Sequence, residues 1–264
     1  AARLSLMNFQ DFLPERVQLF FISATLEISR KVNLAQLLGF QAYQFYHLPA
    51  KNYHQQRIWV DKDFPDLVDL PLSQHARLIA ERIESLSSLN LPILVLFTSK
   101  ELLLEVSENL SLQHLAQYKN GDASNIKRRF DRGEAPILLG TGSFWEGTDF
   151  SSQDKMIQII TRLPFDNPQN VFTQKMNRRL RLEGKNPFYD YGLPVAILRL
   201  KQALGRTVRH RKQQSAVLIL DNRVYTKRYS RQIRGVLTKT APIEQSSFEQ
   251  ILQDMRFYFK NKTV

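Results

Sequence analysis

The chain has 264 residues, of which 43% are hydrophobic and 23% charged, and it contains 10 glycines and 11 prolines. This composition excludes a disordered tail, a collagen-like chain and a low-complexity array, and the length suits one large domain or two small ones. The 37 Lys and Arg residues outnumber the 25 Asp and Glu residues, giving a net charge of +12. Such a charge suits a polyanionic partner, most commonly nucleic acid.

The sequence has no cysteine, which excludes disulfides, thiolate zinc sites and an iron–sulfur cluster within this chain. Its five histidines are scattered rather than spaced as ligands, so we expect no metal site. There is no apolar run of about 18 residues and no signal peptide, and we therefore expect a cytoplasmic protein with no membrane partner.

Apolar runs and helical periods alternate along the chain. Residues 17–22 are expected to form a buried strand, and because the chain opens so close to it, we interpret the sequence as part of a longer protein. Further strands are expected at 57–60, 93–97, 135–139, 156–161 and 216–220, and helices at 72–89, 100–110, 169–181, 194–210 and 248–259. Fully apolar strands separated by helices predict an α/β fold, a parallel β-sheet with helices on both faces and ligands at the carboxyl ends of its strands.

The segment from Gln202 to Arg209, QALGRTVR, carries two arginines and an amide. On a helix that continues to residue 210, Gln202, Arg206 and Arg209 would lie within about 40° of one another on one face. Converging guanidinium groups suit an anion, and arginine stabilises the charge that spreads in phosphoryl transfer. The alternative is a solvated basic face, because further basic residues lie nearby.

A glycine-rich segment, GTGSFWEGTD at residues 140–149, directly follows one of the expected strands. Exposed backbone N–H groups and the hydroxyls of Thr141 and Ser143 are suited to holding phosphate. The segment is not a Walker A loop, which requires the pattern GxxxxGK[ST]. The alternative is a glycine-rich turn whose Phe144 and Trp145 fill the core.

A third segment, LFTSK at residues 96–100, also links a strand end to a helix. Ser99 is well placed to cap that helix, and a cap is the first interpretation of its hydroxyl. Hydroxyls and the N-terminus of a helix also bind the phosphates of nucleic acid. Thr98 and Ser99 are therefore candidate nucleic-acid contacts as well.

These segments, in this order and spacing, resemble the second motor domain of superfamily 2 DNA helicases, in the DinG- and XPD-like branch. SATL resembles motif III, LVLFTSKELL motif IV, GSFWEGTDF motif V and QALGRTVRH motif VI. The resemblance covers nearly the whole chain and implies a RecA-like sheet, with residues 1–30 ending a first motor domain and residues 31–264 forming the second. It also implies an ATP-dependent DNA helicase with a place in DNA repair or replication.

For the nucleotide, the resemblance implies that Arg206 and Arg209 are catalytic arginines that reach the phosphates of ATP. Gln202 resembles the amide that links the nucleotide to the moving domain. The residues that resemble the nucleotide-sensing positions of motif V are Glu146, Gly147 and Asp149. In motif III, Ser23 and Thr25 resemble residues that couple hydrolysis to strand movement.

For single-stranded DNA, Ser99, Thr141 and Ser143 resemble positions that touch the backbone of the strand. Trp145 is a candidate for stacking on a base, with burial in the core as its alternative. The candidate DNA-binding residues are thus Thr98, Ser99, Thr141, Ser143 and Trp145.

Basic stretches are expected to add to DNA affinity. Residues 127–132 and 175–185 would contribute by counterion release. The sequence also departs from the family after motif VI, where His210-Arg211-Lys212 is strongly basic. We interpret that local charge as serving DNA rather than ATP.

The chain lacks a Walker A lysine and a DEAH-type carboxylate pair, which the family keeps in its first motor domain. We therefore expect ATP and Mg²⁺ to be held mainly by that domain, and this chain alone to be unable to turn over ATP. The expected partners are single-stranded DNA and the first motor domain. Two alternatives stay open, a helicase-like DNA-binding module that serves an N-terminal exonuclease domain and a structural basic domain that binds nucleic acid.

Overall fold

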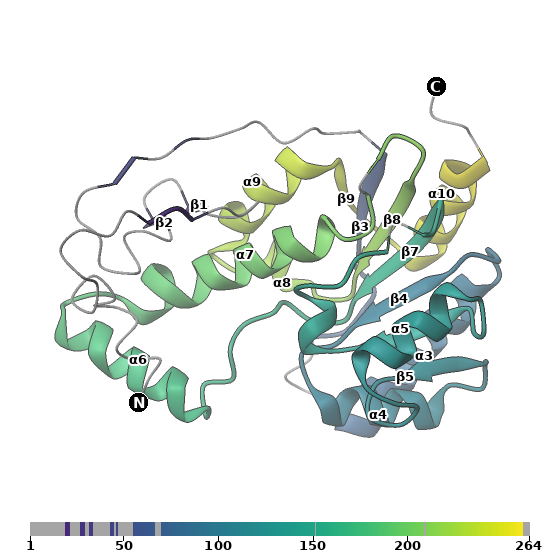
Figure 1. The fold of residues 1–264 in the computed structure, drawn as a ribbon, viewed down its shortest axis with the longest axis horizontal. Coiled ribbons are helices and arrows are strands. Elements are labelled where there is room, and N and C mark those ends of the chain that lie inside the picture. The colour runs from purple at the N-terminus through teal and green to yellow at the C-terminus, as the bar shows by residue number, and fades with distance from the viewer. Residues whose placement is uncertain are drawn as a thin grey trace. The chain divides into compact units, whose positions relative to one another are not determined.

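The structure, a computed structural model, describes residues 19–21, 27–29, 32–33, 43–44, 46, 55–66, 70–150, 152–208 and 210–260 (Figure 1). The chain divides into two compact units, residues 1–52 with 165–198 and residues 53–164 with 199–264. Each unit is described by itself.

The larger unit is built on a seven-stranded sheet in the order β5-β6-β4-β7-β8-β3-β9, and every neighbouring pair is parallel. Its strands are β3 (Gln56–Asp61), β4 (Ile93–Leu96), β5 (His114–Ala116), β6 (Ile137–Gly140), β7 (Lys155–Ile160), β8 (Gln214–Ile219) and β9 (Ile243–Ser246). Its helices are α3 (Leu72–Ser87), α4 (Lys100–Asn109), α5 (Ala123–Asp131), η2 (Gly142–Phe144), α8 (Arg223–Thr226), α9 (Ser230–Thr240) and α10 (Phe248–Lys260). Helix α7 (Leu193–Leu204) begins in the smaller unit and ends in the larger one.

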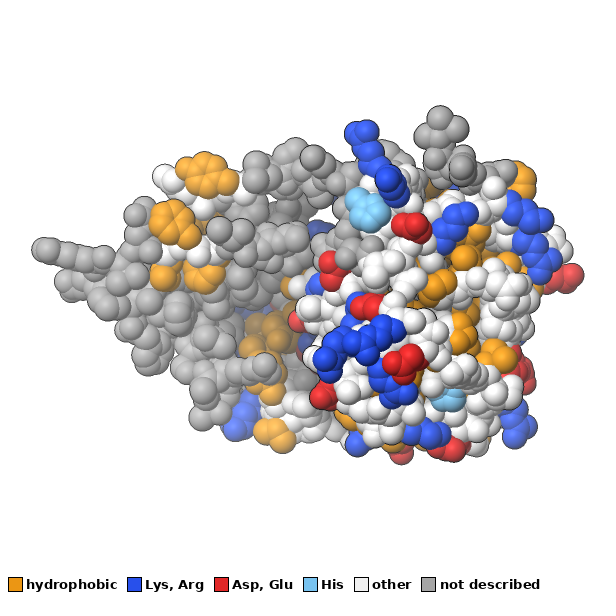
Figure 2. All heavy atoms as spheres, turned by 45° about the vertical axis from the view of Figure 1, so that its right-hand side comes forward, with side chains coloured by type: hydrophobic (Ala, Val, Ile, Leu, Met, Phe, Trp, Pro, Cys, Tyr) orange, Lys and Arg blue, Asp and Glu red, His pale blue; other side chains and the backbone are white. Residues whose placement is uncertain are grey.

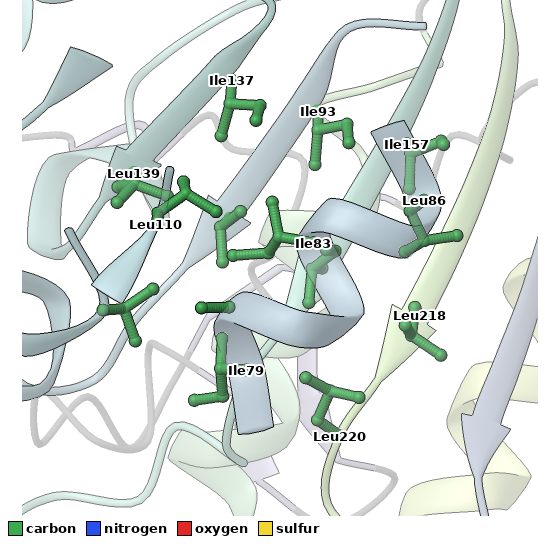
Figure 3. Packing of buried hydrophobic residues seen from close by; sticks show 14 of the residues in the cluster. Ile79, Ile83, Leu86, Ile93, Leu110, Ile137, Leu139, Ile157, Leu218 and Leu220 are labelled. Carbon is green, nitrogen blue, oxygen red and sulfur yellow. The ribbon is translucent and has the colours of Figure 1, made fainter. Parts of the chain in front are cut away.

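The core cluster of the larger unit packs α3, α4 and α10 against the sheet. The apolar stripe of α3 repeats at the helical period, so all its members can face the same side. Ile79, Ile83 and Leu86 point toward the side chains of the neighbouring strands, and all three are fully buried (Figure 3). Strands β4 and β6 are buried along their whole length, as expected where helices cover a parallel sheet.

The smaller unit contains a short antiparallel pair, β1 (Glu27–Ser29) and β2 (Val32–Asn33), and the helices α6 (Val171–Leu182) and η3 (Phe188–Gly192). The side chain of Asn170 caps α6 by accepting a hydrogen bond from Phe172 N at 2.9 Å. Within the same unit, the rings of Phe165 and Phe188 stack with their centroids 5.5 Å apart.

The predicted parallel sheet is confirmed, and the five strands expected between residues 57 and 220 lie at β3, β4, β6, β7 and β8. The buried strand expected at residues 17–22 is wrong for its described part, because residues 19–21 form no strand and Phe20 is 78% exposed. The described strands of the seven-stranded sheet come from residues 56–246. Nowhere in the described ranges is a helix both long and apolar enough to cross a membrane.

Candidate functional site

Three polar loops meet at one edge of the sheet. Strands β4, β5 and β6 are parallel neighbours, so their carboxyl ends lie side by side. Thr98 follows β4, Tyr118 follows β5 and Thr141 follows β6. This edge is where ligands bind in open parallel sheets.

The loop after β4 combines a helix cap with exposed polar groups. Ser99 Oγ accepts a hydrogen bond from Leu102 N at 3.3 Å, so the predicted cap of α4 is confirmed. Thr98 and Lys100 are exposed, and Ser99 is half-buried. The loop therefore presents a hydroxyl and an ammonium group at the start of α4.

The glycine-rich loop after β6 is held by aromatic burial. Phe144 and Trp145 are 0% and 4% exposed, and Trp145 Nε1 donates to the carbonyl oxygen of Phe97 at 2.7 Å. A Cβ at Gly140 would lie 2.3 Å from the Phe144 ring, so only glycine fits beneath it. The core-filling interpretation of the two aromatic residues is thus confirmed, and stacking of a base on Trp145 is wrong, since the buried ring has no open face.

The two hydroxyls predicted on this loop differ in accessibility. Thr141 is 7% exposed, and both its N–H and its hydroxyl donate to Gln117 Oε1, at 2.8 and 3.2 Å. Its hydroxyl also lies 2.8 Å from the phenol oxygen of Tyr118. Ser143 is exposed, and its carbonyl accepts a hydrogen bond from Thr148. Thr141 therefore positions its neighbours, whereas Ser143 is open to a ligand.

The predicted sensing residues Glu146, Gly147 and Asp149 are all exposed on this loop. Glu146 Oε1 lies 3.6 Å from Arg199 Nε on α7, and Arg199 Nη1 donates to the carbonyl of Pro164 at 3.2 Å. This ion pair links the glycine-rich loop to the helix that leads into the arginine segment.

The helix expected to run through the arginine segment to residue 210 ends earlier. Helix α7 ends at Leu204, so Gln202 lies in its last turn and Arg206 lies in the turn that follows, where the Arg206 N–H donates to Ala203 O. The helical-face argument for Gln202, Arg206 and Arg209 is therefore wrong. Arg206 is half-buried. Arg209, Ser23 and Thr25 lie outside the described residues.

Two glutamine side chains from the sheet bind the last carbonyl groups of α7. Gln56 Nε2 donates to Leu204 O at 3.0 Å, and Gln158 Nε2 donates to Ala203 O at 3.1 Å. The last carbonyls of a helix have no partner within the helix, and side-chain amides satisfy them here. Because those amides come from β3 and β7, the C-terminus of α7 is fastened to the sheet.

The turn itself is tied down through Thr207, which is fully buried. Its hydroxyl accepts hydrogen bonds from Gln56 Nε2 at 3.0 Å and Ser215 Oγ at 2.8 Å, and donates to Gln158 Oε1 at 3.5 Å. We call Gln56, Gln158, Thr207 and Ser215 the Thr207 cluster. Sequence reasoning missed this cluster, although a lone glutamine inside the apolar strand MIQIIT is a signal of a buried polar contact.

A second set of polar residues, also missed, lies at the carboxyl ends of β7 and β8. Asp221 is 2% exposed, accepts a hydrogen bond from Leu163 N at 2.8 Å and pairs with Arg223 at 2.6 Å. Burial, together with the charge of Arg223, lowers the pKa of Arg162. The described residues contain no group of three His, Cys, Asp or Glu side chains arranged to hold a metal ion.

The basic stretches are partly neutralised by local carboxylates. Lys127 pairs with Asp131, and Arg129 Nε lies 2.7 Å from Glu134 Oε2. Similar pairs in the second stretch join Arg179 and Lys185 to Glu183. On the face turned to the viewer in Figure 2, acidic side chains likewise lie beside basic ones. The field that these stretches offer to DNA is therefore smaller than their sequence suggests.

Comparison with known proteins identifies relatives of this chain. The helicase C-terminal domain family matches residues 83–240, more than half of the chain. The chain is 31% identical over 210 residues to the 3'-5' exonuclease DinG of Bacillus subtilis, covering 76% of this chain and 23% of that protein. It is 28% identical over 223 residues to the ATP-dependent DNA helicase YoaA of Haemophilus influenzae, covering 79% of this chain and 33% of that protein. The chain thus spans about a quarter to a third of these relatives.

Solved structures share the fold. An XPD helicase superposes with a TM-score of 0.57 at 18% identity, covering 72% of this chain and 35% of the other. Saccharomyces cerevisiae Dbp5 bound to RNA and ADP BeF3 superposes with a TM-score of 0.52 at 13% identity, covering 95% of this chain and 56% of the other. The predicted RecA-like fold of a second helicase domain is confirmed by these neighbours.

Proposed function

The chain belongs to the helicase C-terminal domain family, in the DinG- and XPD-like branch, and we propose that it is the second motor domain of an ATP-dependent DNA helicase. The family match over residues 83–240 is the observation that carries this proposal. Because the chain spans only part of its relatives, the proposal includes a first motor domain, with residues 1–30 as its end and residues 31–264 as the second domain.

In this proposal ATP binds between the two motor domains, and Arg206 and Arg209 reach it from this chain. Arg206 suits the role because it lies half-buried on a turn that the Thr207 cluster holds in place. The two guanidinium groups would stabilise the negative charge that develops on the transferred phosphoryl group. Gln202 would bind the nucleotide, and the exposed loop with Glu146, Gly147 and Asp149 would sense it, with the Arg199 ion pair supporting that link.

Among the described residues, no three or more His, Cys, Asp or Glu side chains are grouped so that they could hold a metal ion. We therefore assign the metal and the phosphate cradle to the first motor domain and derive no step through the metal. Arg206 and Arg209 would bind ATP more tightly than ADP, and this difference in affinity would close and open the cleft between the domains. This chain alone should then hydrolyse no ATP.

Single-stranded DNA would lie along the carboxyl edge of β4, β5 and β6. The exposed Thr98 and Ser143, with the half-buried Ser99, offer hydroxyls and backbone groups to phosphates there. Thr141 would act indirectly, by fixing the loops around it. The net charge of +12 supports a polyanionic partner.

The test uses a protein that carries both motor domains. Arg209→Ala and Arg206→Ala should each lower DNA-stimulated ATPase, by roughly 10³-fold for the arginine finger, while binding of a labelled single strand persists. Arg256→Ala is the matched control, because Arg256 is an exposed arginine on α10, outside the segments assigned to ATP or DNA. ATPase retained in the Arg209→Ala variant would refute the catalytic assignment.

A second candidate is a DNA-binding module that serves a nuclease and has lost motor activity. The exonuclease name of the DinG relatives favours it. It predicts a complete protein in which 3'-5' exonuclease activity depends on this chain, while Arg206→Ala and Arg209→Ala change neither ATPase nor nuclease rates. The two candidates are thus separated by the same variants.

A further inference from the structure

Tyr118 has an unusual backbone conformation. It follows β5 at the carboxyl edge with a φ of 74°, in the left-handed region that favours glycine. Its N–H donates to the carbonyl of Gly121 at 3.2 Å, which closes the turn. A bulky residue persists in this conformation only where its surroundings fix it, and such positions often mark functional sites.

The ring of Tyr118 is fixed by its neighbours and yet remains open. Its phenol oxygen lies 2.8 Å from Thr141 Oγ1, and the ammonium group of Lys100 lies over the ring, 4.8 Å from its centroid. Even so, the residue is 50% exposed. A large aromatic side chain is thus held at the surface by Thr141 and Lys100, with about half of its area open to solvent.

The ammonium group of Lys100 is available to pair with an anionic ligand. Lys119 pairs with Glu108 at 2.7 Å, but Lys100 forms no ion pair within the described ranges. An aromatic ring that is half exposed, with the Lys100 ammonium over one of its faces, suits a ligand that combines a flat ring with a negative charge. A nucleotide unit of single-stranded DNA has both, and its base is free to stack, unlike the paired bases of a duplex.

We propose that Tyr118 and Lys100 form a subsite for one nucleotide of single-stranded DNA. The Tyr118 ring stacks on the base, and the Lys100 ammonium pairs with an adjacent phosphate. The subsite takes Tyr118 from the loop after β5 and Lys100 from the start of α4. It lies on the edge to which the proposed function assigns DNA, and it rests on that function. It gives this edge the aromatic platform that the buried Trp145 does not provide.

The key variant is Tyr118→Gly in the whole 264-residue chain. It removes the ring and also relieves the left-handed backbone, so stability should be unchanged or higher. The matched control is Phe257→Ala, which removes another exposed aromatic ring, 70% exposed, from the far edge of the sheet. Phe257 thus lies near the amino ends of the strands. The carbonyl oxygens of the next two residues of α10, Tyr258 and Phe259, accept hydrogen bonds from the side chains that begin β8 and β7.

Binding is measured by fluorescence anisotropy with two labelled single-stranded oligonucleotides of equal length, one with bases and one abasic. Tyr118→Gly should weaken binding of the base-bearing strand about tenfold and leave abasic binding unchanged, whereas Tyr118→Phe should retain most of the affinity. Lys100→Gln should weaken both and reduce the salt dependence by about one counterion. Phe257→Ala should match the wild type.

The outcomes separate the subsite from the proposed function. If the wild type binds the base-bearing strand and Tyr118→Gly binds it equally well, the subsite is refuted and DNA binding stands. If Tyr118→Gly weakens abasic binding to the same degree or lowers the urea midpoint, Tyr118 is structural and the subsite is again refuted. If the wild type binds neither strand, the DNA-binding part of the proposed function fails, and the subsite with it.

Discussion

The glycine-rich loop and the turn after α7 both carry residues assigned to a proposed ligand, but they are anchored in opposite ways. The loop is held by Phe144 and Trp145, whose rings are buried in the core. The turn is held by hydrogen bonds at Thr207. Apolar burial contributes more free energy, whereas hydrogen bonds are directional and fix an orientation at modest net gain. The loop is thus stabilised mainly by apolar burial, whereas the orientation of the turn is fixed mainly by directional hydrogen bonds.

The largest effect is expected where the anchor is apolar. Phe144→Ala should lower the free energy of unfolding by about 3–5 kcal/mol, because it leaves a cavity beneath the loop. Urea denaturation measures this, with the exposed neighbour Ser143→Ala as a control that should change stability by less than about 0.5 kcal/mol. Equal effects of the two substitutions would show that aromatic burial does not anchor the loop.

The polar anchor should be weaker but more specific. Thr207→Val keeps the shape and removes the hydroxyl. Ser215 Oγ and Gln158 Oε1 then lose this partner, and Gln56 Nε2 loses one of its two acceptors. We expect a loss of about 2–3 kcal/mol in the free energy of unfolding. Thr207→Ser retains the hydroxyl and should lose clearly less. A valine variant as stable as the serine variant would contradict the role of these hydrogen bonds.

The buried imidazole of His75 should make stability depend on pH. His75 is 6% exposed, its Nε2 has no hydrogen-bond partner in the described part of the chain, and burial lowers its pKa to about 4. Since its ordinary pKa is near 6.5, the unfolded chain binds a proton more readily than the folded one. This part of the stability should be complete above about pH 7 and fall as the pH drops to 4, by about 3 kcal/mol.

The measurement is the free energy of unfolding from pH 7 to pH 4, compared between the wild type and His75→Leu. The variant should lack this part of the pH dependence. Parallel curves for the two proteins would mean that His75 is not the titrating group.

The smallest effect is expected at the surface pair between the two regions. Arg199 and Glu146 are 30% and 53% exposed, so their interaction should contribute less than about 1 kcal/mol and decline with added salt. A double-mutant cycle with Arg199→Gln and Glu146→Gln measures the coupling. A coupling energy well above this range would show that the loop and α7 form one anchored unit.

The sequence predicts the parts of this fold that depend on local patterns. Continuous apolar runs indicate β4, β6, β7 and β8, and the helical period indicates α3. The edge strands β5 and β9 were missed because they are three and four residues long and show no clear period.

The candidate site is less predictable because distant residues shape it. The end of α7 is set by Gln56, which is 148 residues away from Leu204, so no local window contains the signal. Trp145 was a fair candidate for stacking by residue type, but its burial depends on the carbonyl of Phe97, 48 residues earlier. Tyr118 gives no sequence signal at all, because its significance lies in a backbone angle and an open ring.

The hydrogen bonds at Thr207 also bear on how movement passes through the molecule. They join the turn carrying Arg206 to three adjacent strands, β7, β8 and β3. Hence the backbone of this turn is fixed to the sheet, and a displacement of the sheet moves the turn with it. A stiff connection of this kind would pass a movement of the sheet to the turn that carries Arg206 with little loss of amplitude.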